Sequence, residues 1–148
     1  DFCLSRGLGD VYKRQRLFAA STIATPNLPE ARILAELPDG SADQCAEKLL
    51  PYIEYLLITG GHGDESDVHN RLYLRDGSCH DFTCARLPGS YHGSGCTLAS
   101  TLAGRLALGQ DLIGAVRTAL DYTWRTLRDA EQPGRGQFVP RRLPLDLS

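Results

Sequence analysis

The segment YLLIT, residues 55–59, constrains the fold most, because it contains no charged residue and does not alternate between apolar and polar positions. A strand with one solvated face would show that alternation, so a run without it has to be covered on both faces. The run ends in the polar, glycine-rich stretch GGHGDESD, residues 60–67. This pattern is typical of a parallel strand in an α/β sheet, followed by a turn at its carboxyl end.

The rest of the chain predicts further strands and helices in alternation. We expect a strand at 21–25, helices at 27–37 and 41–51, a hairpin within 70–87 that turns at Asp76-Gly77, and helices at 95–108 and 111–131. This order predicts an α/β fold with a mainly parallel sheet. Ligands bind at the carboxyl ends of the strands in such sheets, and there we expect three turns to converge: residues 25–27, 59–62 and 93–96.

Composition argues against several classes of protein. The chain has 148 residues, of which 42% are hydrophobic, and a net charge of −2, so neither nucleic acid nor a membrane surface is an expected partner. No apolar run approaches the ~18 residues that span a bilayer. The five cysteines, at 3, 45, 79, 84 and 96, are odd in number and contain no CxxC pair, which favours a reducing cytoplasm over a disulfide framework or a zinc site.

The first fifteen residues, DFCLSRGLGDVYKRQ, show neither helical nor strand periodicity. Their end, GLGDVYKRQ, resembles a translated sequencing-adapter tail, and the chain contains no methionine. We therefore expect residues 1–15 to be a scar rather than native sequence, and residues 16–148 to be the C-terminal part of an N-terminally truncated domain. A genuine irregular N-terminal arm is the alternative.

The stretch YHGSGCTLAST, residues 91–101, places a thiol in the first turn of a predicted helix, behind two glycines. Gly93 and Gly95 let a ligand approach the backbone, and the helix start offers unpaired N–H groups to an anion such as phosphate. No Gly-Lys-Ser/Thr follows, so this is not a Walker loop. The alternatives are a purely structural turn and, for Cys96, the role of a small buried apolar side chain.

Asn27 and Glu30 stand at the start of the helix predicted at 27–37. Asn at the N-cap with Glu three residues later forms a capping box, in which each side chain binds a backbone N–H. The same two side chains could also orient water around a nucleotide-bound Mg²⁺, which keeps several of its waters. The two interpretations are compatible, because Glu30 has a second carboxylate oxygen.

The remaining candidates carry weaker signals. His62, in the glycine-rich turn, and His92, before the glycine loop, are candidates for contact with a ligand. His69 and His80 are expected to be solvated or capping residues. The basic tail is expected to be solvated surface: Arg135, Arg141 and Arg142.

Three motifs together carry a family resemblance: ATPNLPEA (24–31), LLITGGH (56–62) and HGSGCTLASTLAGRLALG (92–109). In this order they resemble the C-terminal half of hydroxymethylpyrimidine/phosphomethylpyrimidine kinases, thiamine-pathway enzymes of the ribokinase-like superfamily. The resemblance implies a three-layer α/β/α fold and ATP- and Mg²⁺-dependent phosphorylation of 4-amino-5-hydroxymethyl-2-methylpyrimidine and its monophosphate. The family commonly dimerises, which leaves a homodimer open for the full-length parent.

The resemblance also implies roles for single residues. It makes Gly93, Ser94 and Gly95 an anion hole and puts Cys96 in the place of the catalytic base. It assigns the ATP and Mg²⁺ side of the site to Asn27, Glu30, Thr59 and Gly61, with Glu30 acting on the metal through water. The sequence departs from the family at two positions: Thr59 stands where the family usually has Lys, and Ser94 where it usually has Thr.

Two alternatives to this function stay open. One is a pyridoxal kinase-type enzyme of the same superfamily. The other is a non-catalytic domain that binds a nucleotide or pyrimidine phosphate without turning it over, which the loss of the lysine at position 59 keeps open. If upstream strands are missing, we expect the 148-residue chain alone to be an incompetent kinase and a poorly folded monomer.

Overall fold

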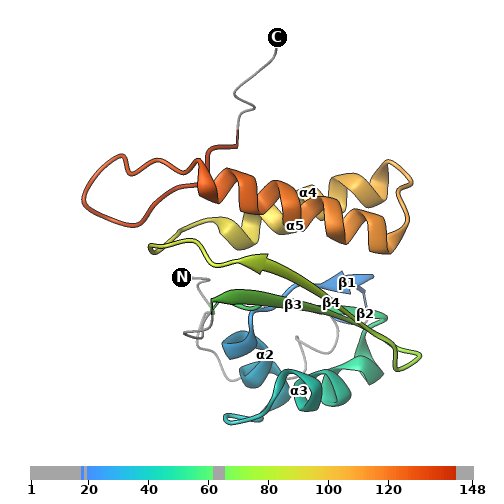
Figure 1. The fold of residues 1–148 in the computed structure, drawn as a ribbon. Coiled ribbons are helices and arrows are strands. Elements are labelled where there is room, and N and C mark those ends of the chain that lie inside the picture. The colour runs from blue at the N-terminus through green and yellow to red at the C-terminus, as the bar shows by residue number, and fades with distance from the viewer. Residues whose placement is uncertain (1–17, 19, 62–65, 143–148) are drawn as a thin grey trace. The chain divides into compact units, whose positions relative to one another are not determined.

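The computed structural model describes residues 18, 20–61 and 66–142, which form two compact units divided between Arg86 and Leu87 (Figure 1). The predicted scar at residues 1–15 and His62 lie outside the described residues. None of the helices in the described ranges is long and apolar enough to cross a membrane.

The first unit holds a four-stranded sheet with the strand order β1-β2-β3-β4. The strands are β1 (Ile23–Ala24), β2 (Tyr55–Ile58), β3 (Asp67–Leu74) and β4 (Cys79–Ala85). β1 and β2 are parallel, as predicted, with Ile23 opposite Tyr55. Leu56 and Leu57, whose side chains point to opposite faces, are both fully buried, which confirms that β2 is covered on both sides.

We predicted a mainly parallel sheet, but most strand pairs in the described part of the chain are antiparallel. β2 pairs with β3 antiparallel, and β3 with β4 antiparallel, so the described sheet is mixed. The connection from Ile58 to Asp67 is shorter than the roughly dozen residues that a parallel crossover needs. The second antiparallel pair is the predicted hairpin, in which Gly77 adopts a left-handed φ of 89°.

Two helices lie on one face of this sheet, α2 (Leu28–Ala35) and α3 (Ala42–Leu49), and α3 continues into a 3₁₀ turn, η1 (Leu50–Tyr52) (Figure 1). Both helices begin at a capping box, with Asn27 and Ser41 as the N-caps. Small residues let the helices approach the strands closely. The core between them consists of Ala31, Ala35, Cys45, Ala46, Leu49, Ile53, Leu56, Ile58 and Tyr73.

The second unit is built on a helical hairpin of α4 (Ser94–Ala107) and α5 (Leu112–Arg128). α4 ends before Gly109, whose φ of 81° is the left-handed conformation common just after a helix C-terminus. α5 begins at Asp111, whose side chain accepts a hydrogen bond from the Gly114 N–H at 2.9 Å. The ends of both helices fall within three residues of their predicted positions.

The tail after α5 is irregular, and hydrogen bonds tie it to the segment that leads into α4. The N–H of Phe138 donates to the carbonyl of Ser90 (2.8 Å), and the Phe138 carbonyl accepts from the His92 N–H (2.9 Å). The rings of Tyr91 and Phe138 are 5.8 Å apart between centroids. The glycine loop is therefore flanked by a chain segment more than forty residues away in sequence.

Candidate active site

The glycine loop forms the N-terminal turn of α4, and this turn has no side-chain cap among the described residues. Gly93 is the N-cap and has a φ of 90°, a conformation that a residue with a Cβ adopts at a cost. A Cβ built on Gly95 would meet no atom within 4 Å, so the backbone is open to a ligand there. Uncapped N–H groups at the positive end of a helix suit an anion.

Cys96 lies in this same turn, and its residue is exposed, so the buried apolar role is wrong for it. The other cysteines in the described ranges lie elsewhere, Cys45 on α3 and both Cys79 and Cys84 on β4. Desolvation raises the pKa of the Cys45 thiol, and also that of Cys79 and Cys84, which favours their neutral forms. Cys45 is buried in the core of the first unit and packs beside Gly40. Among the described cysteines, Cys96 is the one that is exposed in the first turn of a helix, a setting that suits thiol chemistry.

Asn27 and Glu30 form the predicted capping box. The Glu30 N–H donates to Oδ1 of Asn27 at 2.8 Å, and the Asn27 N–H donates to Oε2 of Glu30 at 2.9 Å. Glu30 is half-buried, and its Oε1 atom has no hydrogen-bond partner in the described part of the chain. The capping role is confirmed, and the capping box uses only one of the two carboxylate oxygens of Glu30.

The turns that follow β1 and β2 meet, as the α/β pattern predicts. Asn27 and Thr59 form a parallel bridge, and the Thr59 N–H donates to the carbonyl of Pro26 at 2.9 Å. Asn27, Glu30, Thr59 and Gly61 therefore belong to one edge of the sheet. The glycine loop belongs to the second compact unit, so its convergence with these turns stays a prediction.

Gly60 and Gly61 give the turn after β2 its shape. A Cβ on Gly60 would lie 2.4 Å from the carbonyl oxygen of His69, so only glycine fits there. The Gly60 N–H donates to Oδ1 of the buried Asn70 at 3.3 Å. Gly61 has a φ of 109° and open space where its Cβ would be.

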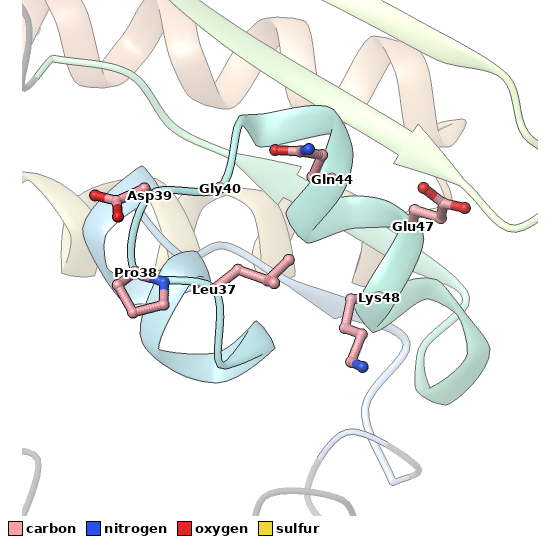
Figure 2. Close-up of a pocket in the computed structure, with 7 residues that line it drawn as sticks. All are labelled: Leu37, Pro38, Asp39, Gly40, Gln44, Glu47 and Lys48. Atoms are coloured by element: carbon pink, nitrogen blue, oxygen red, sulfur yellow. The ribbon is translucent and has the colours of Figure 1, made fainter.

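No described part of the chain groups three or more His, Cys, Asp or Glu side chains in a way that could hold a metal ion. A Mg²⁺ ion held mainly by phosphates and water needs only one or two carboxylates from the protein, so Glu30 is compatible with it. A hollow of about 660 Å³ in the first unit lies at the turn between α2 and α3, and none of the predicted site residues lines it (Figure 2).

Comparison with known proteins decides the family. The family model described as phosphomethylpyrimidine kinase matches residues 8–141. A hydroxymethylpyrimidine/phosphomethylpyrimidine kinase from Mycobacterium tuberculosis (strain ATCC 25618 / H37Rv) is 38% identical over 128 residues, which cover 83% of this chain and 46% of the relative. A protein of the same name from Streptomyces coelicolor is 41% identical over 117 residues, 74% of this chain and 42% of the relative.

The chain belongs to the phosphomethylpyrimidine kinase family. It spans about half the length of the curated relatives it matches. Among solved structures, the pyridoxal kinase from Staphylococcus aureus in complex with AMP-PCP superposes with a TM-score of 0.84 at 23% identity, over 93% of this chain and 52% of that one. This likeness confirms the ribokinase-like α/β fold expected from the three motifs.

In this member of the phosphomethylpyrimidine kinase family, an arginine contacts the turn after β2. Thr59 lies in that turn, at the position where we expected the family's lysine. Nη1 of Arg86 donates to the carbonyl of Gly61 at 2.9 Å. Arg86 follows β4 directly, and its N–H pairs with the Ser66 carbonyl, so the hairpin register carries it back to the end of β2. We did not predict Arg86 from the sequence; counting the hairpin outward from Asp76-Gly77 would have placed it beside Ser66.

The remaining candidates, histidines and arginines, lie partly on the surface and partly beside the glycine loop. His69 pairs with Asp81 across the hairpin at 2.8 Å, which fits a surface role, and the exposed His92 precedes the glycine loop. Arg141 forms a surface ion pair with Glu131 at 3.4 Å. Arg142 is exposed, as predicted, and its guanidinium also contacts the glycine loop, which the sequence did not indicate.

Proposed function

We propose that this chain is the half of a hydroxymethylpyrimidine/phosphomethylpyrimidine kinase that holds the transferred phosphoryl group and the catalytic base. The observation that carries the proposal is the uncapped, glycine-lined start of α4 with the exposed Cys96 in its first turn. The substrate class comes from the names of relatives that are 38% and 41% identical to this chain.

The chemistry would run as follows for a substrate that carries a hydroxymethyl group. The Cys96 thiolate accepts the hydroxyl proton while the hydroxyl oxygen bonds to the γ-phosphorus of ATP, and the bond from that phosphorus to the bridging oxygen of ADP breaks. The N–H groups of Ser94, Gly95 and Cys96 face the charge that spreads over the transferred group. Positioning and charge neutralisation provide most of the catalysis in such transfers.

The edge of the first unit would serve the nucleotide. Oε1 of Glu30 would hold water bound to Mg²⁺, whose charge offsets that of the phosphates when it is present. Arg86 fixes the Gly61 carbonyl, which keeps the open turn 59–61 in one conformation. Mg²⁺, a homodimeric assembly and a cytoplasmic location are parts of the proposal that the family suggests.

A hybrid enzyme tests the substrate. In it, residues 16–148 replace the matching segment of the M. tuberculosis relative, and ATP-dependent phosphorylation is measured for hydroxymethylpyrimidine, its monophosphate and pyridoxal. We expect kcat/KM to be highest for the two pyrimidines. Preference for pyridoxal would support the pyridoxal kinase alternative, and a soluble hybrid that binds ATP without turnover would support the non-catalytic one.

A further inference from the structure

Arg142 reaches the glycine loop from the far end of the second unit. Its Nε atom donates to Oγ1 of Thr97 at 3.0 Å, and its Nη2 atom donates more weakly to the Gly93 carbonyl at 3.5 Å. The approach is close enough that a Cβ built on Gly93 would lie 2.8 Å from Nη2. Because Nη2 ends a flexible side chain that can shift, the φ of 90° is the main reason for glycine at this position.

Thr97 connects Arg142 to the loop. It is 4% exposed, and both its N–H and its Oγ1 donate to the Gly93 carbonyl, at 3.1 and 2.8 Å. The Thr97 hydroxyl therefore gives its proton to Gly93 and accepts one from Arg142. With Nη2 added, three donors converge on one carbonyl oxygen, and Arg142 orients the hydroxyl that supplies one of them.

The orientation of the Gly93 carbonyl sets the direction of an N–H group in the proposed anion hole. The C=O of Gly93 and the N–H of Ser94 belong to one planar trans peptide, so they point in opposite directions. Holding the oxygen toward Thr97 and Arg142 aims the Ser94 N–H away from them, out of the first turn of α4. A peptide free to rotate would lose that aim.

Arg142 is itself fixed from α5 and the tail. Its carbonyl accepts a hydrogen bond from the Tyr122 hydroxyl at 2.6 Å, and the neighbouring Arg141 N–H donates to the Thr126 carbonyl at 2.9 Å. No carboxylate forms an ion pair with Arg142 in the described ranges. A guanidinium stays charged at any relevant pH, and here it stands beside the positive end of a helix. An anion in the loop would relieve that repulsion.

We propose that Arg142 is a positioning residue of the glycine loop, which acts through Thr97 and Gly93 to aim the Ser94 N–H at the transferred phosphoryl group. The proposal rests on the proposed function for the identity of the ligand. That Arg142 holds the loop rests only on its hydrogen bonds to Thr97 and Gly93. The planar fork of arginine is what allows Nε and Nη2 to reach two acceptors, so a lysine at this position would keep the charge and lose the geometry.

The first experiment measures, without any ligand, how strongly Arg142 stabilises the glycine loop. Amide hydrogen exchange is followed by NMR in the hybrid enzyme, which carries residues 16–148, for the unmodified segment, Arg142→Ala, Thr97→Val and the matched control Arg141→Ala. We expect exchange of the Thr97 N–H to become ~10-fold faster in Arg142→Ala and Thr97→Val, since each removes a hydrogen bond that supports the turn, and to change less than about twofold in Arg141→Ala. Equal exchange in Arg142→Ala and Arg141→Ala would overturn the proposal.

The second experiment titrates the same proteins, and Arg142→Lys, with inorganic phosphate and follows the Ser94 amide signal. We expect the phosphate concentration for half-saturation to rise ~5–10-fold in Arg142→Ala and to rise no further in the double variant with Thr97→Val. Arg142→Lys should recover less than half of the lost affinity. Additive effects or full rescue by lysine would contradict action through Thr97. If phosphate did not shift the Ser94 signal of the unmodified loop, that result would count against the proposed function. The exchange rates would still show whether Arg142 stabilises the glycine loop.

Discussion

Asn27 and Glu30 bind one another's backbone through two hydrogen bonds of 2.8 and 2.9 Å, which leave Oε1 of Glu30 without a partner in the described residues. One residue pair therefore has a structural task that is visible and a metal task that is proposed. The two tasks use different atoms of the same carboxylate, so substitutions can separate them.

Glu30→Gln should preserve the cap and impair the metal task, because glutamine can close a capping box but carries no charge. In the hybrid enzyme we expect the Mg²⁺ concentration for half-maximal rate to rise ~10-fold, as for other losses of a group around a bound metal. Glu30→Ala should in addition lower the free energy of unfolding by about 1 kcal/mol. Unchanged Mg²⁺ dependence in Glu30→Gln would reduce Glu30 to a helix cap.

Gly60→Ala should destabilise the first unit. The added Cβ would stand 2.4 Å from the His69 carbonyl oxygen, a backbone atom that moves only with β3. We expect a loss of ~1–3 kcal/mol in urea unfolding, the range for overpacking. The matched control is Gly104→Ala in α4, where a Cβ meets nothing within 4 Å, and which should stabilise by up to ~1 kcal/mol. A neutral Gly60→Ala would show that the close approach is not rigid.

Tyr73 should make stability fall at high pH. Its hydroxyl donates to Oδ1 of Asp43 at 2.6 Å, and burial, followed by that carboxylate, raises the pKa of Tyr73. The neutral form is therefore favoured in the folded state. Its stabilisation is complete below the unfolded pKa of about 10 and is lost as the pH rises from there toward the folded pKa.

Tyr73→Phe isolates this effect from the titration of other groups. At pH 7 it should cost about 1 kcal/mol, since the exposed Asp43 regains water in exchange for the hydrogen bond. Above pH 10 the unfolding free energies of wild type and variant should approach one another. Parallel curves from pH 8 to 11 would mean that Tyr73 titrates alike in the folded and unfolded states.

Local patterns predicted the elements of this fold well. The apolar run at 55–59, the Asp76-Gly77 turn and the N-cap at Asn27 each act over a few residues, and each element formed near its expected place. Whether two neighbouring strands pair parallel or antiparallel depends on the length of their connection. The eight residues 59–66 are too few for a parallel crossover between β2 and β3. The antiparallel β2–β3 pair was therefore readable from loop length, and the pattern of apolar runs alone missed it.

The site shows the same division. The glycine loop, Cys96 and the capping box are contiguous in sequence, so their spacing was enough to find them. Arg86 and Arg142 reach their turns through tertiary structure, across a hairpin in one case and past α5 in the other. An arginine in a polar stretch has the same local pattern whether it is solvated or clamps a distant loop, and no periodicity separates the two.

The turnover of Cys96→Ala in the hybrid enzyme tests the central claim most directly, with Cys79→Ala as the control because Cys79 is exposed and lies on β4. If Cys96 accepts the proton of the attacking hydroxyl, kcat for hydroxymethylpyrimidine should fall ~10²–10⁴-fold while ATP binding persists, the range for a positioned general base. Cys79→Ala should stay within about twofold of the wild type. Near-normal kcat in Cys96→Ala would contradict the account.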